Sequence, residues 1–96
     1  MGIPELIGSK REMILTLAGK YGVDRVRIFG SVARDEARTD SDVDFLVHFK
    51  NGRTLFDLIG FGQDVEELLG RKVDVLSERG VSPYMKDRIF KEAVPL

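Results

Sequence analysis

The 96-residue chain has 32% charged and 43% hydrophobic residues, a formal net charge of −1 and no cysteine. This length and composition fit one globular domain, residues 1–96, and the balanced charge argues against nucleic acid as the main partner. The lack of cysteine excludes disulfides and thiolate metal sites, and no apolar run approaches the roughly 18 residues that a membrane span needs, so we expect a cytoplasmic protein without a membrane partner.

The first half of the chain predicts a helix followed by two strands. Residues 4–20 place apolar side chains mostly at helical spacing, and Tyr21-Gly22 indicates where that helix ends. Residues 25–29 alternate between apolar and polar and predict a strand. A short helix or turn is expected at 31–37, before a second strand at 42–49.

The second half predicts a long helix, a third strand and a closing helix. Thr54 and Asp57 resemble a capping box that starts the long helix, and Gly70 is a suitable C-terminal cap. Gly60 and Gly62 weaken its pattern and predict a bend. The other expected elements are a turn at 50–53, a strand at 72–77, a loop at 80–83 and a helix at 84–93. This alternation predicts an α/β or α+β fold, with helices packed on a sheet.

Two aspartates stand one residue apart in the second predicted strand. Because side chains on a strand alternate between its faces, Asp42 and Asp44 point the same way, roughly 7 Å apart, while Val43 and Phe45 point to the other face. Like charges at that spacing raise each other's pKa unless a cation lies between them. Asp74, in the third predicted strand, joins them if the two strands are neighbours. Three carboxylates on rigid strands predict a Mg²⁺ site, for one or two ions.

These aspartates have two other interpretations. An Asp-x-Asp pair on a strand is often only a hydrated face, so the pair alone does not establish a site. The calcium-binding loop of an EF-hand shares the spacing of Asp40, Asp42 and Asp44, but it requires glycine where Phe45 stands and glutamate where Asn51 stands. The calcium loop is therefore excluded, and the hydrated face stays open as an alternative.

The turn before these aspartates combines Gly30, Ser31 and Arg34. A strand that ends in glycine, followed by a serine that can cap a short helix, presents free backbone N–H groups, which suit a phosphate. Arg34 lies three residues after Ser31, on the same helical face, and adds positive charge. The alternative is structural: Gly30 makes a tight turn, Ser31 caps the helix and Arg34 is solvated. Neither a Walker A motif nor a dinucleotide-binding fingerprint is present.

Taken together, these motifs resemble a known family. Gly30-Ser31, ten further residues, Asp42-Val43-Asp44 and a later strand aspartate are similar to the signature of the DNA polymerase beta-like nucleotidyltransferase superfamily. The string RIFGSVARDEARTDSDVDFLV resembles its small stand-alone branch, the minimal nucleotidyltransferases, and the resemblance extends over most of the chain. Asp35 departs from the pattern, because glycine is common there in the family, and we expect the exposed turn to tolerate it.

The resemblance implies a mixed β-sheet with flanking helices and a site for a nucleoside triphosphate, with ATP as the family default. In that site Gly30 and Ser31 would hold the terminal phosphates, and Arg34 would neutralise phosphate charge. The implied reaction transfers a nucleoside monophosphate to a hydroxyl group and releases pyrophosphate.

The resemblance also assigns roles to the three aspartates. Asp42 and Asp44 would bind the Mg²⁺ that accompanies the nucleotide and would help to bind a second ion. Asp74 would complete the second metal site and act on the attacking hydroxyl, as a ligand or a base. All three would be catalytic residues and metal ligands.

In the family, such small proteins are commonly paired with a HEPN-domain ribonuclease toxin. The resemblance therefore implies an antitoxin that transfers AMP to a tyrosine of that toxin. The alternative is a binding module that neutralises its partner by contact, with a vestigial nucleotide site. His48 shares the aspartate face, and we expect it to be a solvated edge residue. Several apolar side chains could serve an interface or a homodimer, although we expect most of them to pack in the core: Phe56, Phe61, Tyr84, Met85 and Phe90.

Overall fold

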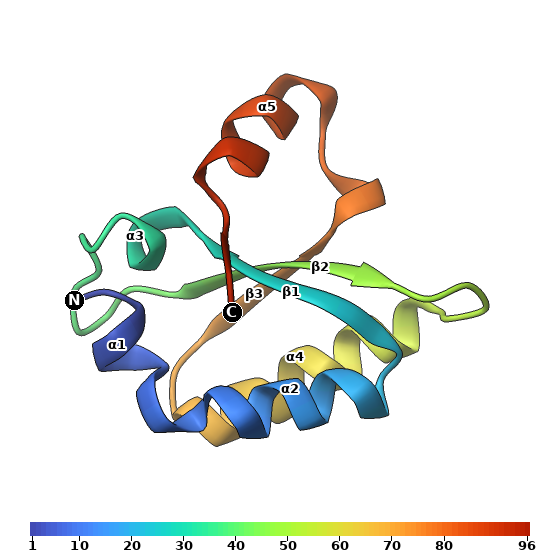
Figure 1. Cartoon of the computed structure of the whole chain (residues 1–96), viewed down its shortest axis with the longest axis horizontal. Helices are drawn as coiled ribbons and strands as arrows, with labels where there is room; N and C mark the ends of the chain where they lie inside the picture. The colour runs from blue at the N-terminus through green and yellow to red at the C-terminus, as the bar shows by residue number, and fades with distance from the viewer.

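A four-stranded mixed sheet crosses the computed structural model, which describes residues 1–96 (Figure 1). The strands are β1 (Val23–Phe29), β2 (Val43–Phe49), β3 (Val73–Ser77) and β4 (Val94–Pro95). Their order is β3-β2-β1-β4, with β1 antiparallel to β2 and β4, and β2 parallel to β3. Parallel neighbours need a crossover connection, and a helix supplies it between β2 and β3. The predicted sheet with flanking helices is confirmed.

Helices lie on both sides of this sheet (Figure 1). The helical segments, with η for a 3₁₀ turn, are α1 (Ile3–Leu6), η1 (Gly8–Lys10), α2 (Arg11–Lys20), α3 (Gly30–Ala33), α4 (Leu55–Leu69), η2 (Glu78–Gly80) and α5 (Pro83–Glu92). The α2 and α4 helices run side by side across one face, and α5 stands over the other. None of the helices combines the length and the apolar character needed to cross a membrane.

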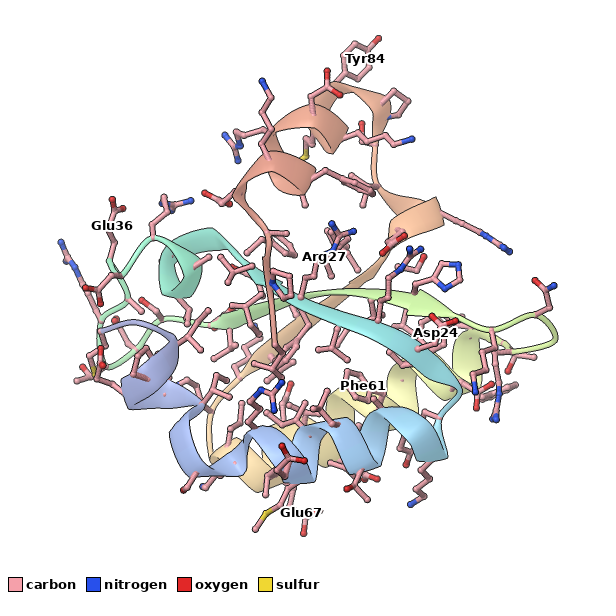
Figure 2. The ribbon with its side chains drawn as sticks, viewed as in Figure 1. Asp24, Arg27, Glu36, Phe61, Glu67 and Tyr84 are labelled. Carbon is pink, nitrogen blue, oxygen red and sulfur yellow. The ribbon has the colours of Figure 1, made fainter.

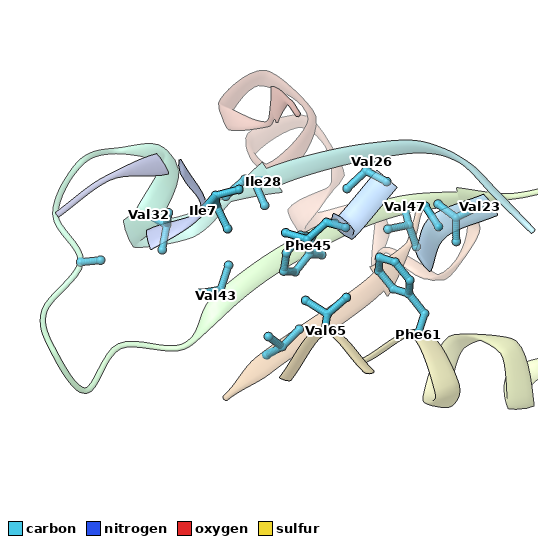
Figure 3. Close-up of a cluster of buried hydrophobic side chains, with 14 residues drawn as sticks. Ile7, Val23, Val26, Ile28, Val32, Val43, Phe45, Val47, Phe61 and Val65 are labelled. Carbon is cyan, nitrogen blue, oxygen red and sulfur yellow. The ribbon is translucent and has the colours of Figure 1, made fainter. Parts of the chain in front are cut away.

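Hydrophobic side chains are buried on both faces of the sheet, in two clusters. The larger cluster lies between the sheet and the α2–α4 pair, where the rings of Phe45 and Phe61 meet edge to face with centroids 6.1 Å apart (Figure 3). The middle of β2 is buried on both sides, so Leu46 on the second face is as inaccessible as Phe45 on the first. The smaller cluster joins the second face to α5 and contains Phe29, Leu46, Val81 and Ile89.

The local signals around α4 are confirmed. The Thr54 N–H donates to Asp57 Oδ2 at 2.9 Å, as expected of the predicted capping box. The helix ends at Gly70, whose φ is 62°.

The three predicted strands are present, each with ends shifted by two residues or fewer.

One prediction about the start of the chain is wrong, and one element at its end is not predicted. The single helix predicted over 4–20 is split into α1, η1 and α2, because Gly8 has a φ of 41°, which a right-handed helix cannot continue through. The fourth strand is an addition to the prediction. It has two residues, one of them Pro95, so it carries no alternation to recognise, and as an edge strand it tolerates proline.

Gly60 makes room for a close contact between two helices, and α4 is one continuous helix through Gly60 and Gly62. A Cβ atom at Gly60 would lie 2.5 Å from Cε1 of the Tyr21 ring. The hydroxyl of the same tyrosine donates to Asp64 Oδ2 at 2.6 Å, one turn further along α4. The glycine therefore gives the end of α2 room to cross α4.

The apolar residues that we expect mostly in the core are in fact divided between the core and the surface. Phe61 is fully buried and Phe90 partly buried, but Phe56 is 84% exposed and Tyr84 is 99% exposed. Phe56 lies five residues before Phe61, roughly 140° around the helix, and therefore faces away from the sheet. Tyr84 lies at the tip of α5, the part of the molecule farthest from the sheet (Figure 2), and Met85 beside it is also exposed.

Replacing Gly60 by alanine is expected to destabilise the protein, although alanine favours helix. The added methyl group must displace the Tyr21 ring and disturb its bond to Asp64, which costs on the order of 1–3 kcal/mol. Gly62→Ala is the matched control on the same helix, because a Cβ there makes an ordinary contact, 3.4 Å from Val75 Cγ2. It should gain about 0.5–1 kcal/mol from helix propensity. Urea unfolding measures both, and a similar gain from both substitutions would contradict this account of Gly60.

Candidate active site

Two of the three predicted aspartates lie side by side where β2 and β3 begin. The parallel register pairs Asp44 with Asp74, so their carboxylates project from one face of adjacent strands about 4.8 Å apart. Asp42 lies two residues before Asp44, immediately outside β2. The proximity of Asp74, which the sequence makes conditional on the order of the strands, is confirmed by the register.

Gly30 packs against the Asp44 carboxylate. The register of β1 and β2 sets Phe29 beside Asp44, and Gly30 then turns the chain into α3 with a φ of 74°. A Cβ atom at Gly30 would overlap Asp44 Oδ2, so the contact and the backbone conformation both require glycine. Ser31 lies inside α3, which begins at Gly30 with Phe29 as its N-cap, so the predicted capping role of Ser31 is wrong.

Arg34 and Glu92 form the next layer of this site. The Arg34 Nη1 group donates to Glu92 Oε1, and the Gly30 N–H donates to Glu92 Oε2 at 2.8 Å. Arg34 Nε also donates to Glu36 Oε2 at 3.2 Å. The predicted phosphate-neutralising arginine is therefore paired with two carboxylates of its own chain.

Glu92 is the site residue that sequence reasoning misses. It is the last residue of α5, and a helix dipole disfavours negative charge at that end unless another group stabilises it. An acidic residue in the last turn of a helix is thus the one signal that could have drawn attention to it. The partners that hold it, Gly30 and Arg34, are about 60 residues away in sequence, and only the fold brings them together.

The carboxylates carry more charge than the nearby cation balances. Burial raises the pKa of Asp44 to about 6, the charges of Asp74 and Asp42 add to that effect, and the Arg34 guanidinium offsets only part of it. No three His, Cys, Asp or Glu side chains enclose a common point suited to an ion, so the predicted ligands lie near one another without forming a closed cage. The chemistry of the donor set nevertheless fits Mg²⁺, which takes carboxylate oxygens and neutralises surplus negative charge.

Away from the aspartates, the same sheet face carries a separate group of paired charged side chains. Glu78 accepts hydrogen bonds from Arg25 and Arg27, each at 2.9 Å; Arg27 is paired with Leu46 in the middle of the face, and Arg25 is paired with His48 farther along. The predicted edge residue His48 is partly exposed and lies 2.6 Å from Asp24, where its hydrogen bond lowers the pKa of the Asp24 carboxyl. These polar residues are not part of the aspartate site.

A cleft of about 330 Å³ lies at the end of the sheet far from the aspartates. It opens where β2 and β3 finish, whereas the aspartates stand where the two strands start. The side chains that line it include Phe49, Lys50, Arg53, Leu55, Leu58 and Arg79. None of the three predicted aspartates lines this cleft, so the grouped carboxylates, and not the cleft, identify the candidate site.

The family comparison matches residues 10–96 to the nucleotidyltransferase domain. Among named relatives, the chain is 44% identical over 88 residues to a Methanocaldococcus jannaschii protein whose name proposes protein adenylyltransferase activity, covering 92% of this chain and 95% of that protein. It is 35% identical over 88 residues to the protein adenylyltransferase MntA of Thermococcus cleftensis, covering 86% and 89% of the two chains.

Solved structures share the same architecture. One, whose description proposes a minimal nucleotidyltransferase, superposes with a TM-score of 0.87 at 48% identity and covers 100% of this chain and 97% of its own. Another describes a tri-AMPylated Shewanella oneidensis HEPN toxin in complex with an MNT antitoxin. That structure matches with a TM-score of 0.66 at 16% identity, covering 88% of this chain and 66% of its own, which is a likeness of fold.

Asp44→Asn is expected to stabilise the metal-free protein at pH 8. The pKa of Asp44 is raised to about 6 in the folded state, so the folded protein binds the proton more tightly than the unfolded chain and loses stability as the pH rises from about 4 past 6. Asparagine avoids that loss. After allowance for the half-exposed position, the gain is on the order of 1 kcal/mol, or a few degrees in Tm.

The pH dependence of that gain is the decisive measurement. Thermal unfolding of both proteins at pH 4 should give little difference, because Asp44 is protonated there when folded. Asp40→Asn, at an exposed aspartate before β2, controls for loss of a charge. A lower Tm for Asp44→Asn at pH 8 would show that this carboxylate has a stabilising partner.

Proposed function

The chain belongs to the nucleotidyltransferase family and is a nucleotidyltransferase, and from this premise we propose that it transfers AMP from ATP to a hydroxyl group of a partner protein. The hydroxyl oxygen would form a bond to the α-phosphorus while the bond from that phosphorus to the departing oxygen breaks. Pyrophosphate leaves, and the hydroxyl proton passes to a carboxylate or to water. Positioning and charge compensation are the main contributions a protein makes to such a transfer.

One observation carries the proposal. Asp44 and Asp74 are in register on neighbouring strands, and the Gly30 backbone packs directly against the first of them. The carboxylates proposed to bind metal and the turn proposed to bind phosphate therefore lie in one small region. The alternative interpretation of the sequence is a hydrated strand face, which would leave Asp44 exposed. Asp44 is instead half-buried, and its surroundings disfavour the ionised carboxylate.

The turn would bind the phosphate end of the nucleotide. The Gly30 N–H and the Arg34 guanidinium are hydrogen-bond donors that already hold an anionic group, the carboxylate of Glu92. Phosphate oxygens accept from the same donors, with more charge and more acceptor positions. Ser31, adjacent to Gly30, would complete the contact with the terminal phosphates.

The carboxylates would hold the metal ions and the acceptor. Asp42 and Asp44 would hold the Mg²⁺ of the nucleotide, and Asp74 with them a second ion. When bound, Mg²⁺ neutralises triphosphate charge and lowers the pKa of the attacking hydroxyl. Asp74 is the exposed member of the group, so it is the carboxylate best placed to orient an incoming hydroxyl and to accept its proton.

We propose a HEPN-domain toxin as the partner and one of its tyrosines as the acceptor. Two relatives carry names that include protein adenylyltransferase, and one structure of the same fold describes an AMPylated HEPN toxin in complex with an MNT antitoxin. The exposed apolar residues Phe56, Tyr84 and Met85 supply surface for a protein contact. In this proposal the chain acts as an antitoxin.

Asp42→Asn and Asp44→Asn are each expected to reduce AMP transfer by about 10²–10³, because each removes a charged oxygen ligand from the reacting centre. Intact mass spectrometry of the proposed HEPN-domain partner, after incubation with this chain, Mg²⁺ and each nucleoside triphosphate, measures the transfer and identifies the donor. Asp40→Asn is the matched control, an aspartate in the same segment but outside the site, and should retain activity.

Asp74→Asn separates catalysis from neutralisation by contact. If the chain acts as an enzyme, this variant should leave the toxin unmodified and active. Inhibition of the toxin by Asp74→Asn, without added mass, would instead establish a binding module with an inactive nucleotide site.

A further inference from the structure

The side chain of Glu92 is inserted between the two donors that the proposed function assigns to phosphate. Its Oε2 accepts from the Gly30 N–H at 2.8 Å, and its Oε1 accepts from Arg34 Nη1. The side chain is only 17% exposed, so the contact is covered by protein. Burial alone would raise the pKa of Glu92, but the hydrogen bonds from Arg34 and Gly30 outweigh it and lower that pKa, so the group is an anion at neutral pH.

The packing of α5 does not require Glu92 to bind there. Among the apolar residues of α5, Ile89 is buried and Phe90 partly buried, and these two anchor the helix on the sheet. Glu92 lies at the C-terminal end of its own helix, where the helix dipole disfavours an anion. Its interaction with Gly30 and Arg34 is therefore the local feature that stabilises a charge in an otherwise unfavourable position.

The charges around Glu92 also disfavour a carboxylate at this position. The Glu92 carboxylate is near enough to contribute to the raised pKa of Asp44, so it adds negative charge to a region that already holds three aspartates. The same Arg34 has a second carboxylate, Glu36, that is 65% exposed and does not reach Gly30. Arg34 thus has a solvent-side partner and does not need Glu92 for neutralisation.

We propose that Glu92 is a built-in competitor of the nucleotide, which occupies the position of the terminal phosphates until a triphosphate displaces it. This inference rests on the proposed function and adds a residue that sets nucleotide affinity. Carboxylate and phosphate oxygens accept hydrogen bonds from the same N–H and guanidinium donors, so one anion can replace the other. Release of Glu92 needs only rotation about its own side-chain bonds, while Ile89 and Phe90 keep α5 in place.

The cost to the nucleotide follows from competition for the donors. A ligand that binds only molecules with a free site has its apparent Kd divided by the fraction of such molecules. If Glu92 occupies the donors in about nine molecules of ten, removing it strengthens binding about tenfold. The opposite role, in which Glu92 orients Arg34 toward the nucleotide, requires that removing it weakens binding. The two roles therefore differ in the sign of the effect.

Glu92→Gln tests the sign with little change of shape, and Glu92→Ala removes the group altogether. Calorimetric titration of the full chain with ATP and Mg²⁺ should give binding about tenfold tighter for either variant than for the unmodified protein. Glu36→Gln is the matched control, because it removes a carboxylate from the same arginine without freeing the Gly30 N–H, and it should change the Kd by less than about twofold. Titration with AMP, which lacks the terminal phosphates, should show no gain.

The outcomes separate this inference from the proposed function. Unchanged or weaker ATP binding by both Glu92 variants, with Tm values showing that they are folded, would overturn the inference while leaving the nucleotide site intact. An equal gain for AMP and ATP would also overturn it, because Glu92 would then not occupy the terminal-phosphate position. If neither the unmodified protein nor any variant binds ATP, the proposed function fails and the inference fails with it.

Discussion

The contact between the Gly30 backbone and the Asp44 carboxylate is the constraint on which the rest of the site depends. Any side chain at residue 30 would occupy the space of Asp44 Oδ2, so the turn after β1 and the first residues of β2 fit together only with glycine. This contact sets the distance between the donors that would hold phosphate and the carboxylates that would hold metal. Because the turn at Gly30 follows β1 and the carboxylates lie on β2 and β3, the backbone register of these paired strands sets that distance.

The sheet itself is arranged so that one strand supports two functions. One face of β2 carries Val43, Phe45 and Val47 into the main core, where α2 and α4 cover them. The opposite face begins with Asp44 and continues to Leu46, which α5 covers. Burial of the middle of this second face anchors α5, and α5 in turn carries Glu92 back to the turn at Gly30. The small second cluster is therefore a structural link between the sheet and the site.

Much of this could be predicted from the sequence, because strand alternation and short-range caps are local. The strand that carries Asp44, the capping box at Thr54 and the end of α4 at Gly70 all follow from neighbouring residues. Contacts between distant segments could not be predicted in the same way. The role of Gly60 depends on where Tyr21 crosses α4, and the role of Glu92 depends on the path of α5. A glycine in a helix and an acid at a helix end are unfavourable locally, and in both cases a tertiary contact explains them.

The charge balance of the site constrains what can bind there. The charges of Asp42, Asp74 and Glu92 oppose ionisation of Asp44, Arg34 offsets them only in part, and Arg88 adds positive charge near Glu92. Two ionised groups about 5 Å apart repel by about 3 kcal/mol at an effective dielectric constant of 20. A free polyanion would add to this repulsion, whereas a nucleotide that arrives with divalent cations would relieve it. Displacement of Glu92 would then be coupled to metal binding at Asp44, because the same cations neutralise the carboxylates and accompany the phosphates. A site with this balance favours the metal–nucleotide complex over the free nucleotide, because the cations remove the repulsion that the free polyanion would meet.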